Sequence, residues 1–146
     1  MNAVTAPERP DDLPATMGQE RITLLDAEAG RAIIEYRAAV RMCHSGGVVQ
    51  GGFIAGWLDA AMAHAAMAQA GMDISPMTLE LKVSYFSPVG PGLVIAEGWV
   101  ERRGRSTCFL EARLTNASGE VMAKASSTVR LIARAKVEAR ATGQST

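Results

Sequence analysis

Alternating apolar and polar residues predict β-strands over much of the chain. In residues 79–85 the apolar side chains stand at every second position, and residues 108–115 show the same period of two. Each of these segments predicts a strand with one face toward a core and the other toward solvent. A composition rich in Val, Ile, Thr and aromatic residues extends the prediction to five segments, which are 31–39, 78–86, 93–102, 106–115 and 121–132.

A nearly uncharged stretch, residues 45–72, has a different pattern. It consists mostly of Ala, Gly and Met, and Asp59 is its single formal charge. Glycines at both ends can open and close a helix, so the stretch predicts about five helical turns over residues 53–70. Polar residues inside the stretch and the lack of a basic flank argue against a membrane span. A helix that is small and apolar on nearly every side needs protein around it, so we expect other segments to enclose it.

Together these elements predict an α+β fold in which one sheet curls around one helix. The predicted order is two early strands, the helix, and then four strands in an antiparallel meander. The turns expected between the last four strands are residues 87–92, 103–105 and 116–119. The length of 146 residues suits one domain, which we place at residues 20–132. Residues 1–19 predict a mobile N-terminal tail, and residues 133–146 a C-terminal tail that frays or forms a loose helix.

Composition and charge narrow the class of function. Hydrophobic residues make up 48% of the chain, which is enough for a core, and Lys+Arg and Asp+Glu each number 15. This balance gives no positive field to attract nucleic acid or an anionic membrane. Two cysteines and two histidines are too few, and wrongly spaced, for a disulfide framework or a zinc site. We therefore expect a reduced cytoplasmic protein with no metal, no nucleic-acid partner and no membrane contact.

A motif opens the predicted helix. It reads His44-Ser-Gly-Gly-Val-Val-Gln50-Gly51-Gly52, and Asp59 follows eight residues after Gly51. This spacing resembles the signature of hotdog-fold acyl-CoA thioesterases of the phenylacetate-pathway (PaaI-like) type. His44 stands where that family commonly has Asn, and Gln50 stands where it commonly has His.

The likeness extends beyond the motif over about residues 20–132. It includes Thr78 on the strand after the helix, the Tyr-Phe-Ser-Pro sequence of residues 85–88, and the Arg-Gly-Arg-Ser turn of residues 103–106. The resemblance implies the hotdog fold, an antiparallel curved sheet wrapped around one long central helix. It also implies hydrolysis of an aryl or medium-chain acyl-CoA to the free acid and CoA. No cofactor is implied, because CoA is part of the substrate.

The chemistry of thioester hydrolysis suits the motif residues. A carbonyl oxygen gathers negative charge when water attacks, and a backbone N–H at a helix N-terminus can stabilise it. The resemblance gives this role to the Gly51 amide. Asp59 is the expected base or nucleophile, and the alternative is a core carboxylate bonded to a hydroxyl or amide. Thr78 either hydrogen-bonds Asp59, as the resemblance implies, or only favours the strand.

The helix geometry separates the two main candidates. Eight residues at about 1.5 Å each place Gly51 and Asp59 roughly 12 Å apart along the axis, yet both must approach one reacting group to within about 3 Å. One chain cannot supply both residues to one carbonyl, whereas a two-fold dimer with antiparallel helices can. The resemblance implies the same arrangement, with the two sheets joined edge to edge. We expect a homodimer, or a homotetramer made of two dimers.

The supporting residues leave alternatives open. His44 and Gln50 either position water and Asp59 or only hydrogen-bond the loop. The turn of Arg103, Gly104, Arg105 and Ser106 either presents guanidinium and N–H groups to the phosphates of CoA or is a solvated basic turn. We place that turn, together with Gly52, in the substrate-binding set.

Two other functions remain as alternatives. One is an acyl-CoA-binding sensor without catalysis, which would keep the pocket and the Arg turn. The other is a hotdog hydratase or dehydratase, although the Asp and His signature of that group is not found in the sequence.

Overall fold

The structure is a computed structural model that describes residues 12–143. Most of the predicted N-terminal tail, residues 1–11, and the last three residues of the predicted C-terminal tail lie outside this range. The helices and strands follow the order α1 (Asp12–Thr16), β1 (Gln19–Asp26), β2 (Arg31–Ala38), η1 (Val40–Met42), β3 (Cys43–His44), β4 (Val48–Val49), α2 (Gly51–Ala70), β5 (Ile74–Tyr85), β6 (Gly92–Arg103), β7 (Thr107–Asn116), β8 (Val121–Ala133) and α3 (Arg134–Ala141).

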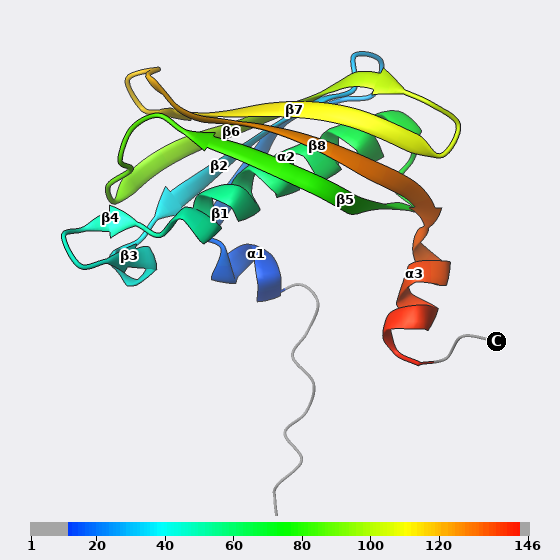
Figure 1. Cartoon of the computed structure of the whole chain (residues 1–146), viewed down its shortest axis with the longest axis horizontal. Coiled ribbons are helices and arrows are strands. Elements are labelled where there is room, and N and C mark those ends of the chain that lie inside the picture. The colour runs from blue at the N-terminus through cyan, green and yellow to red at the C-terminus, as the bar shows by residue number, and fades with distance from the viewer. Residues whose placement is uncertain (1–11, 144–146) are drawn as a thin grey trace, which may run out of the picture.

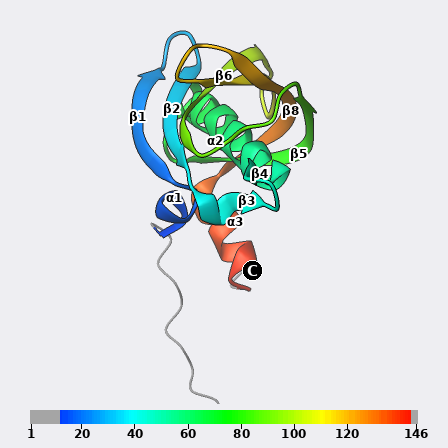
Figure 2. The same cartoon turned by 90° about the vertical axis from the view of Figure 1, so that its left-hand side faces the viewer.

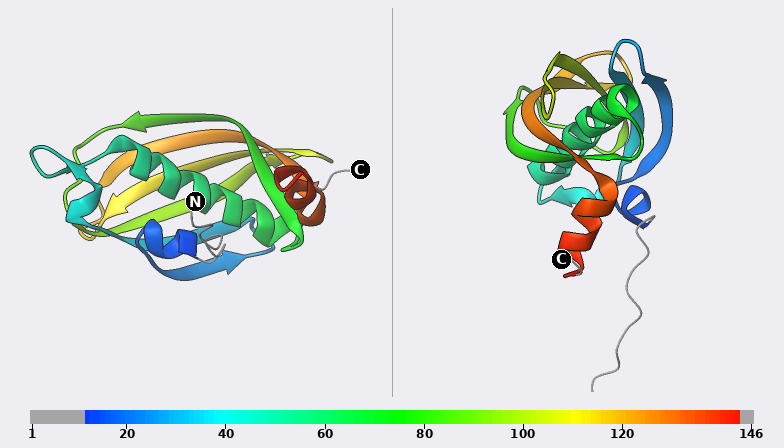
Figure 3. Two further views of the ribbon diagram at one scale, coloured as in Figure 1. Left: turned by 90° about the horizontal axis from the view of Figure 1, so that it is seen from below. Right: turned by 90° about the vertical axis from the view of Figure 1, so that its right-hand side faces the viewer.

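Six long antiparallel strands form one curved sheet in the order β1-β2-β6-β7-β8-β5 (Figure 1). Viewed along the helix, the sheet curls around α2 (Figure 2). Seen from below, α2 lies along the open side of the sheet, with α1 beside it and α3 near one end (Figure 3). The predicted α+β architecture, a hotdog fold with one long central helix, is confirmed.

The core lies between α2 and the inner face of the sheet. Alternate side chains of each strand point inward, as in β7, where Cys108, Leu110, Ala112 and Leu114 are buried. The helix contributes one apolar face, and its buried residues are Ile54, Trp57, Leu58, Ala61, Met62, Ala65 and Ala66. The rings of Tyr36 and Trp57 stack with centroids 5.6 Å apart. These contacts hold α2 in one position on the sheet.

The opposite face of α2 is only partly covered. Its residues are small or apolar and half-buried, and they include Phe53, Ala60, Ala63 and Met67. Asp59 lies on this face, one turn before Ala63. The expectation that protein encloses the helix is therefore met on one face by this chain. Among residues 12–143, none of the helices combines the length and the apolar composition that a membrane span requires.

The last four strands do not form the predicted meander. Strands β6, β7 and β8 are consecutive neighbours, but β5 pairs with β8 and β6 pairs with β2. The connection from β5 to β6 carries Pro88 and Pro91, which have no N–H to donate to a hairpin ladder. This connection instead runs past the start of α2, where the Val49 N–H donates to the Val89 oxygen at 2.8 Å. Strand β5 consequently forms a free edge of the sheet.

Within the described residues, regular secondary structure begins earlier than the predicted domain. Residues 12–19, assigned to the tail, form α1 and lead into β1. The indole N–H of Trp57 donates to the Met17 oxygen at 2.8 Å, and the Met17 side chain packs against Gly56. A tryptophan with a buried N–H needs such an acceptor, which the N-terminal segment supplies. At the other end, part of the predicted C-terminal tail forms α3.

Gly98 of β6 offers a direct test of how closely the helix packs on the sheet. A Cβ added there would lie 2.6 Å from the backbone carbonyl of Ala61 in α2, which cannot move away alone. We expect Gly98→Ala to lower the free energy of unfolding by about 3 kcal/mol. Gly90→Ala is the matched control because nothing lies within 4 Å of its added Cβ. Equal denaturant midpoints for the two variants would contradict this packing.

Candidate active site

The first turn of α2 leaves one backbone donor free. Gln50 caps the helix with extended backbone angles, φ −63° and ψ 134°, and its Oε1 accepts from the Gly52 N–H at 2.7 Å. The Gln50 N–H donates to the Met42 oxygen, and the Phe53 N–H donates to the Gln50 oxygen. Among residues 12–143, the Gly51 N–H has no acceptor outside the helix. This donor stands at the positive end of the helix dipole, where it can bind an oxyanion.

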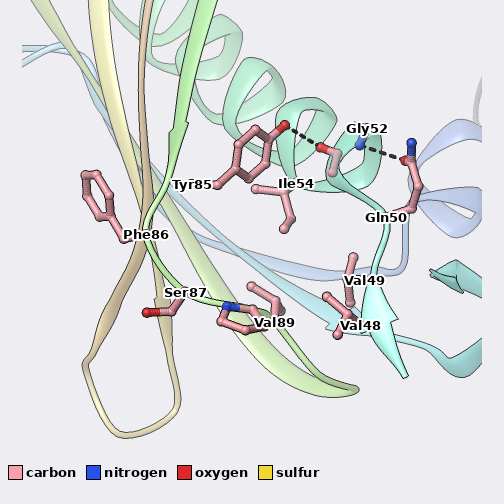
Figure 4. Close-up of a pocket in the computed structure, with 11 residues that line it drawn as sticks. Val48, Val49, Gln50, Gly52, Ile54, Tyr85, Phe86, Ser87 and Val89 are labelled. Atoms are coloured by element: carbon pink, nitrogen blue, oxygen red, sulfur yellow. Dashed lines mark hydrogen bonds between the residues drawn. The ribbon is translucent and has the colours of Figure 1, made fainter. Parts of the chain in front are cut away.

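A cavity of about 550 Å³ opens beside this donor. Its walls come from β4, the start of α2, the end of β5 and the connection that follows (Figure 4). The lining residues are Val48, Val49, Gln50, Gly51, Gly52, Ile54, Tyr85, Phe86, Ser87, Pro88 and Val89. None of them is charged, so the cavity suits an apolar group.

Asp59 lies two turns further along the same helix and does not line the cavity. The Thr78 hydroxyl of β5 donates to Asp59 Oδ1 at 2.8 Å. This bond orients the carboxylate and leaves Oδ2 for another partner. The expected contact between Thr78 and Asp59 is thus present. Because α2 is continuous from Gly51, the separation of about 12 Å along the axis that the sequence predicted also holds.

Gln50 and His44, the two positions that depart from the family pattern, have different environments. Gln50 lines the cavity, but its side-chain oxygen is engaged by the Gly52 N–H. His44 lies on the β3–β4 hairpin, is exposed, and contacts the Ser45 oxygen through Nδ1 at 2.9 Å. It is not one of the cavity residues. The structure therefore gives Gln50 a capping role that the sequence pattern left open.

The Arg turn lies near the other end of α2. The Arg103 guanidinium donates to the Gln69 oxygen in the last helical turn at 3.2 Å, where a cation also complements the helix dipole. The Gly104 N–H donates to the Thr107 oxygen, and the Ser106 oxygen accepts from the Leu131 N–H. Arg105 is exposed. Within this turn the structure ties Arg103 to the helix and leaves the Arg105 side chain in solvent.

Other reactive side chains lie away from the cavity. Cys108 is fully buried in the core, and burial raises the pKa of its thiol, which disfavours a thiolate nucleophile. His64 contacts the Ala60 oxygen within α2 through Nδ1 at 2.8 Å. In the part of the chain that the structure describes, no three His, Cys, Asp or Glu side chains gather into a metal-binding group.

Of the eleven cavity residues, only Gln50, Gly51 and Gly52 were predicted as site residues, and Tyr85 is a further one that contacts the start of α2. Tyr85 ends β5, and its hydroxyl donates to the Gly51 oxygen at 2.8 Å. Its position at the start of the Tyr-Phe-Ser-Pro sequence was the available signal, but the contact joins residues 34 positions apart in the chain.

Comparisons with known proteins identify the family and the fold. The family model of the thioesterase superfamily matches residues 46–123, from the loop before α2 into β8. A comparison with curated proteins finds no match. A phenylacetic acid degradation-related protein from Ralstonia eutropha is 31% identical, with a TM-score of 0.76 over 85% of this chain and 92% of that one.

Two more distant solved structures share the fold. The PaaI protein of the Escherichia coli phenylacetic acid degradation operon is 18% identical, with a TM-score of 0.76 over 84% of this chain and 86% of that one. A thioesterase protein from Streptococcus pneumoniae, solved with coenzyme A, is also 18% identical. Its TM-score is 0.70 over 77% of this chain and 88% of that one.

Proposed function

We propose that this chain, which belongs to the thioesterase superfamily, hydrolyses an acyl-CoA thioester to the free acid and CoA. The resemblance to PaaI-like hotdog thioesterases that the motif indicated is confirmed. The observation that carries the proposal is the free Gly51 N–H at the edge of an uncharged cavity. An acyl group in the cavity would bring its carbonyl oxygen to this donor.

The proposed reaction uses two groups of the chain. The Gly51 N–H stabilises the negative charge that develops on the carbonyl oxygen. As a base, the Asp59 carboxylate takes a proton from water while the water oxygen bonds to the carbonyl carbon. The carbon–sulfur bond then breaks, and the CoA sulfur receives the proton. As a nucleophile, the Asp59 carboxylate would instead bond to the carbonyl carbon and expel CoA as the thiolate, which leaves a mixed anhydride. Water would then cleave the anhydride to the free acid and the Asp59 carboxyl group, whose proton passes to the CoA sulfur. In both routes Thr78 holds the carboxylate through Oδ1.

A second copy of the chain completes the proposed site. Gly51 and Asp59 are about 12 Å apart along one helix, so we assign them to two protomers related by a two-fold axis. Strand β5 supports this pairing because it is a free edge 12 residues long that exposes Met77 and Leu79. The half-open apolar face of α2 supports it too, since a partner helix would cover that face. The resulting homodimer can pair again into a homotetramer.

The cavity favours an apolar acyl group. Six of its lining side chains, from Val48, Val49, Ile54, Phe86, Pro88 and Val89, are apolar, and no lining side chain is cationic. An aryl or medium-chain acyl group fits this lining, whereas a dicarboxylic acyl group would lose its hydration without a charged partner. We therefore assign aryl and medium-chain acyl-CoA as substrates.

The nucleotide end of CoA is assigned to the Arg turn. Arg105 is exposed and can reach a phosphate, while Gly104 and Ser106 shape the turn and Arg103 holds it to α2. The Streptococcus pneumoniae thioesterase of the same fold was solved with coenzyme A, which supports a CoA ligand here.

Replacing Asp59 tests the proposed reaction. Asn has the size of Asp but neither takes a proton nor attacks a carbonyl, so we expect Asp59→Asn to lower kcat by roughly two to four orders of magnitude. Thiol release from hexanoyl-, phenylacetyl- and succinyl-CoA measures the loss, and calorimetry measures ligand binding. The wild type should prefer the first two substrates, and the variant should still bind them.

His44→Ala and Gln50→Ala serve as comparison variants, and both should cost less activity than Asp59→Asn. Binding of acyl-CoA without turnover by the wild type would identify a sensor. A larger loss of kcat from His44→Ala than from Asp59→Asn would identify His44 as the catalytic residue and contradict the assignment to Asp59.

Arg105→Ala tests the assigned phosphate contact. We expect KM for acyl-CoA to rise about tenfold, a typical value for a charge-assisted hydrogen bond, with kcat and thermal stability unchanged. KM for the matching acyl-N-acetylcysteamine thioester, which has no nucleotide, should stay the same. Arg103→Ala is a useful contrast because it should also lower Tm through loss of the Gln69 contact. If Arg105→Ala changes KM equally for both thioesters, the turn does not bind the nucleotide of CoA.

A further inference from the structure

Tyr85 touches the peptide group that follows the proposed oxyanion donor. It is the last residue of β5, and its phenol lies against the first turn of α2 (Figure 4). The hydroxyl donates to the Gly51 oxygen at 2.8 Å. A Cβ added at Gly51 would lie 3.1 Å from the phenol oxygen, so the ring leaves little room there. The contact joins the edge strand to the start of the helix.

Hydrogen bonds therefore hold the peptide group between Gly51 and Gly52 at both ends. Its oxygen accepts from Tyr85, and its N–H donates to Gln50 Oε1 at 2.7 Å. The preceding peptide group, which carries the Gly51 N–H, is held through the Gln50 oxygen by the Phe53 N–H. Both peptide planes beside Gly51 are thus restrained.

Glycine makes such restraint necessary. Because glycine has no Cβ, the backbone of Gly51 can adopt a wider range of φ and ψ than that of any other residue type. The direction of its N–H is then set by the hydrogen bonds on the flanking peptide groups rather than by its own sterics. A small rotation would point the donor away from the carbonyl oxygen, and catalytic donors are sensitive to such misplacement.

We propose that Tyr85 is a positioning residue that orients the Gly51 N–H toward the substrate oxyanion. The inference rests on the proposed function and adds a residue to it. Tyr85 acts through Gly51 and needs no contact with the reacting atoms. The side chain is 51% exposed, so its ring contributes little to the core and its hydroxyl contact is its main link to the helix.

Tyr85→Phe removes the hydroxyl and keeps the ring. We expect kcat for phenylacetyl-CoA to fall about tenfold, because a misaligned donor stabilises the transition state less. KM should change less than about twofold, and Tm should stay within about 2 °C. The matched control is Tyr36→Phe, which deletes the hydroxyl of the only other tyrosine in the chain, in the core away from the cavity. Its kcat should equal that of the wild type.

A second pair of variants separates positioning from a general structural role. Gly51→Pro deletes the N–H at the first helical position, where proline is tolerated, and Gln50 already has the extended angles that precede proline. Gly51→Ala adds a Cβ while keeping the N–H and is the reference background. Tyr85→Phe should lower kcat further in Gly51→Ala and should have no further effect in Gly51→Pro.

Three results would overturn the inference. The first is an unchanged kcat for Tyr85→Phe. The second is a further loss of kcat in the Gly51→Pro background equal to that in the Gly51→Ala background. The third is a loss of kcat accompanied by a matching fall in Tm. A wild type without thioesterase activity would refute the proposed function instead, so the two failures are distinguishable.

Discussion

The close packing of α2 on the inner face of the sheet fixes where Gly51 and Asp59 stand relative to the strands. At Gly98 the strand approaches the helix backbone itself, and a single methyl group would not fit between them. Trp57 adds a second restraint, since it stacks on Tyr36 and donates to the Met17 oxygen. Gly51 and Asp59 lie on this one continuous helix, about 12 Å apart along its axis, so no movement of the helix on the sheet brings them together. In the proposed mechanism the site of one chain is therefore half a site, and we assign the second copy to the free edge of β5 and the half-open face of α2.

The two ends of α2 have different environments that match its dipole. At the N-terminus, within residues 12–143, Gln50 accepts from the Gly52 and Phe53 N–H groups, and the Gly51 N–H has no acceptor. No acidic side chain lines the neighbouring cavity. The positive end of the dipole thus remains available for a developing negative charge. At the C-terminus Arg103 donates to the Gln69 oxygen. One arginine therefore stabilises the helix end, while Arg105 in the same turn is exposed, as the proposed phosphate contact requires.

Local patterns were sufficient to predict the helix and the segments of five of the six long strands. The contact between Thr78 and Asp59 was one of two alternatives, and it was implied by the family resemblance. The period of two in β7 and the small apolar residues of α2 are properties of neighbouring residues. The motif that opens the helix supplied the candidate site residues. The pairing of β5 with β8 was not predictable in the same way, because the alternation within a strand does not specify which strand lies beside it. The contacts of Trp57 with Met17 and of Tyr85 with Gly51 join residues 40 and 34 positions apart. Such contacts follow from the folded geometry and left no periodic signal in the sequence.

Mixing two inactive variants tests whether each site combines Gly51 of one protomer with Asp59 of another. One chain carries Gly51→Pro and the other Asp59→Asn, and the two are co-expressed with different tags and purified together. A mixed dimer then holds one intact site and one doubly altered site, so random pairing restores about a quarter of the wild-type sites. We predict recovery of about a quarter of wild-type thiol release, or about half in the purified mixed dimer. A mixed dimer with no more activity than either parent would contradict the shared site.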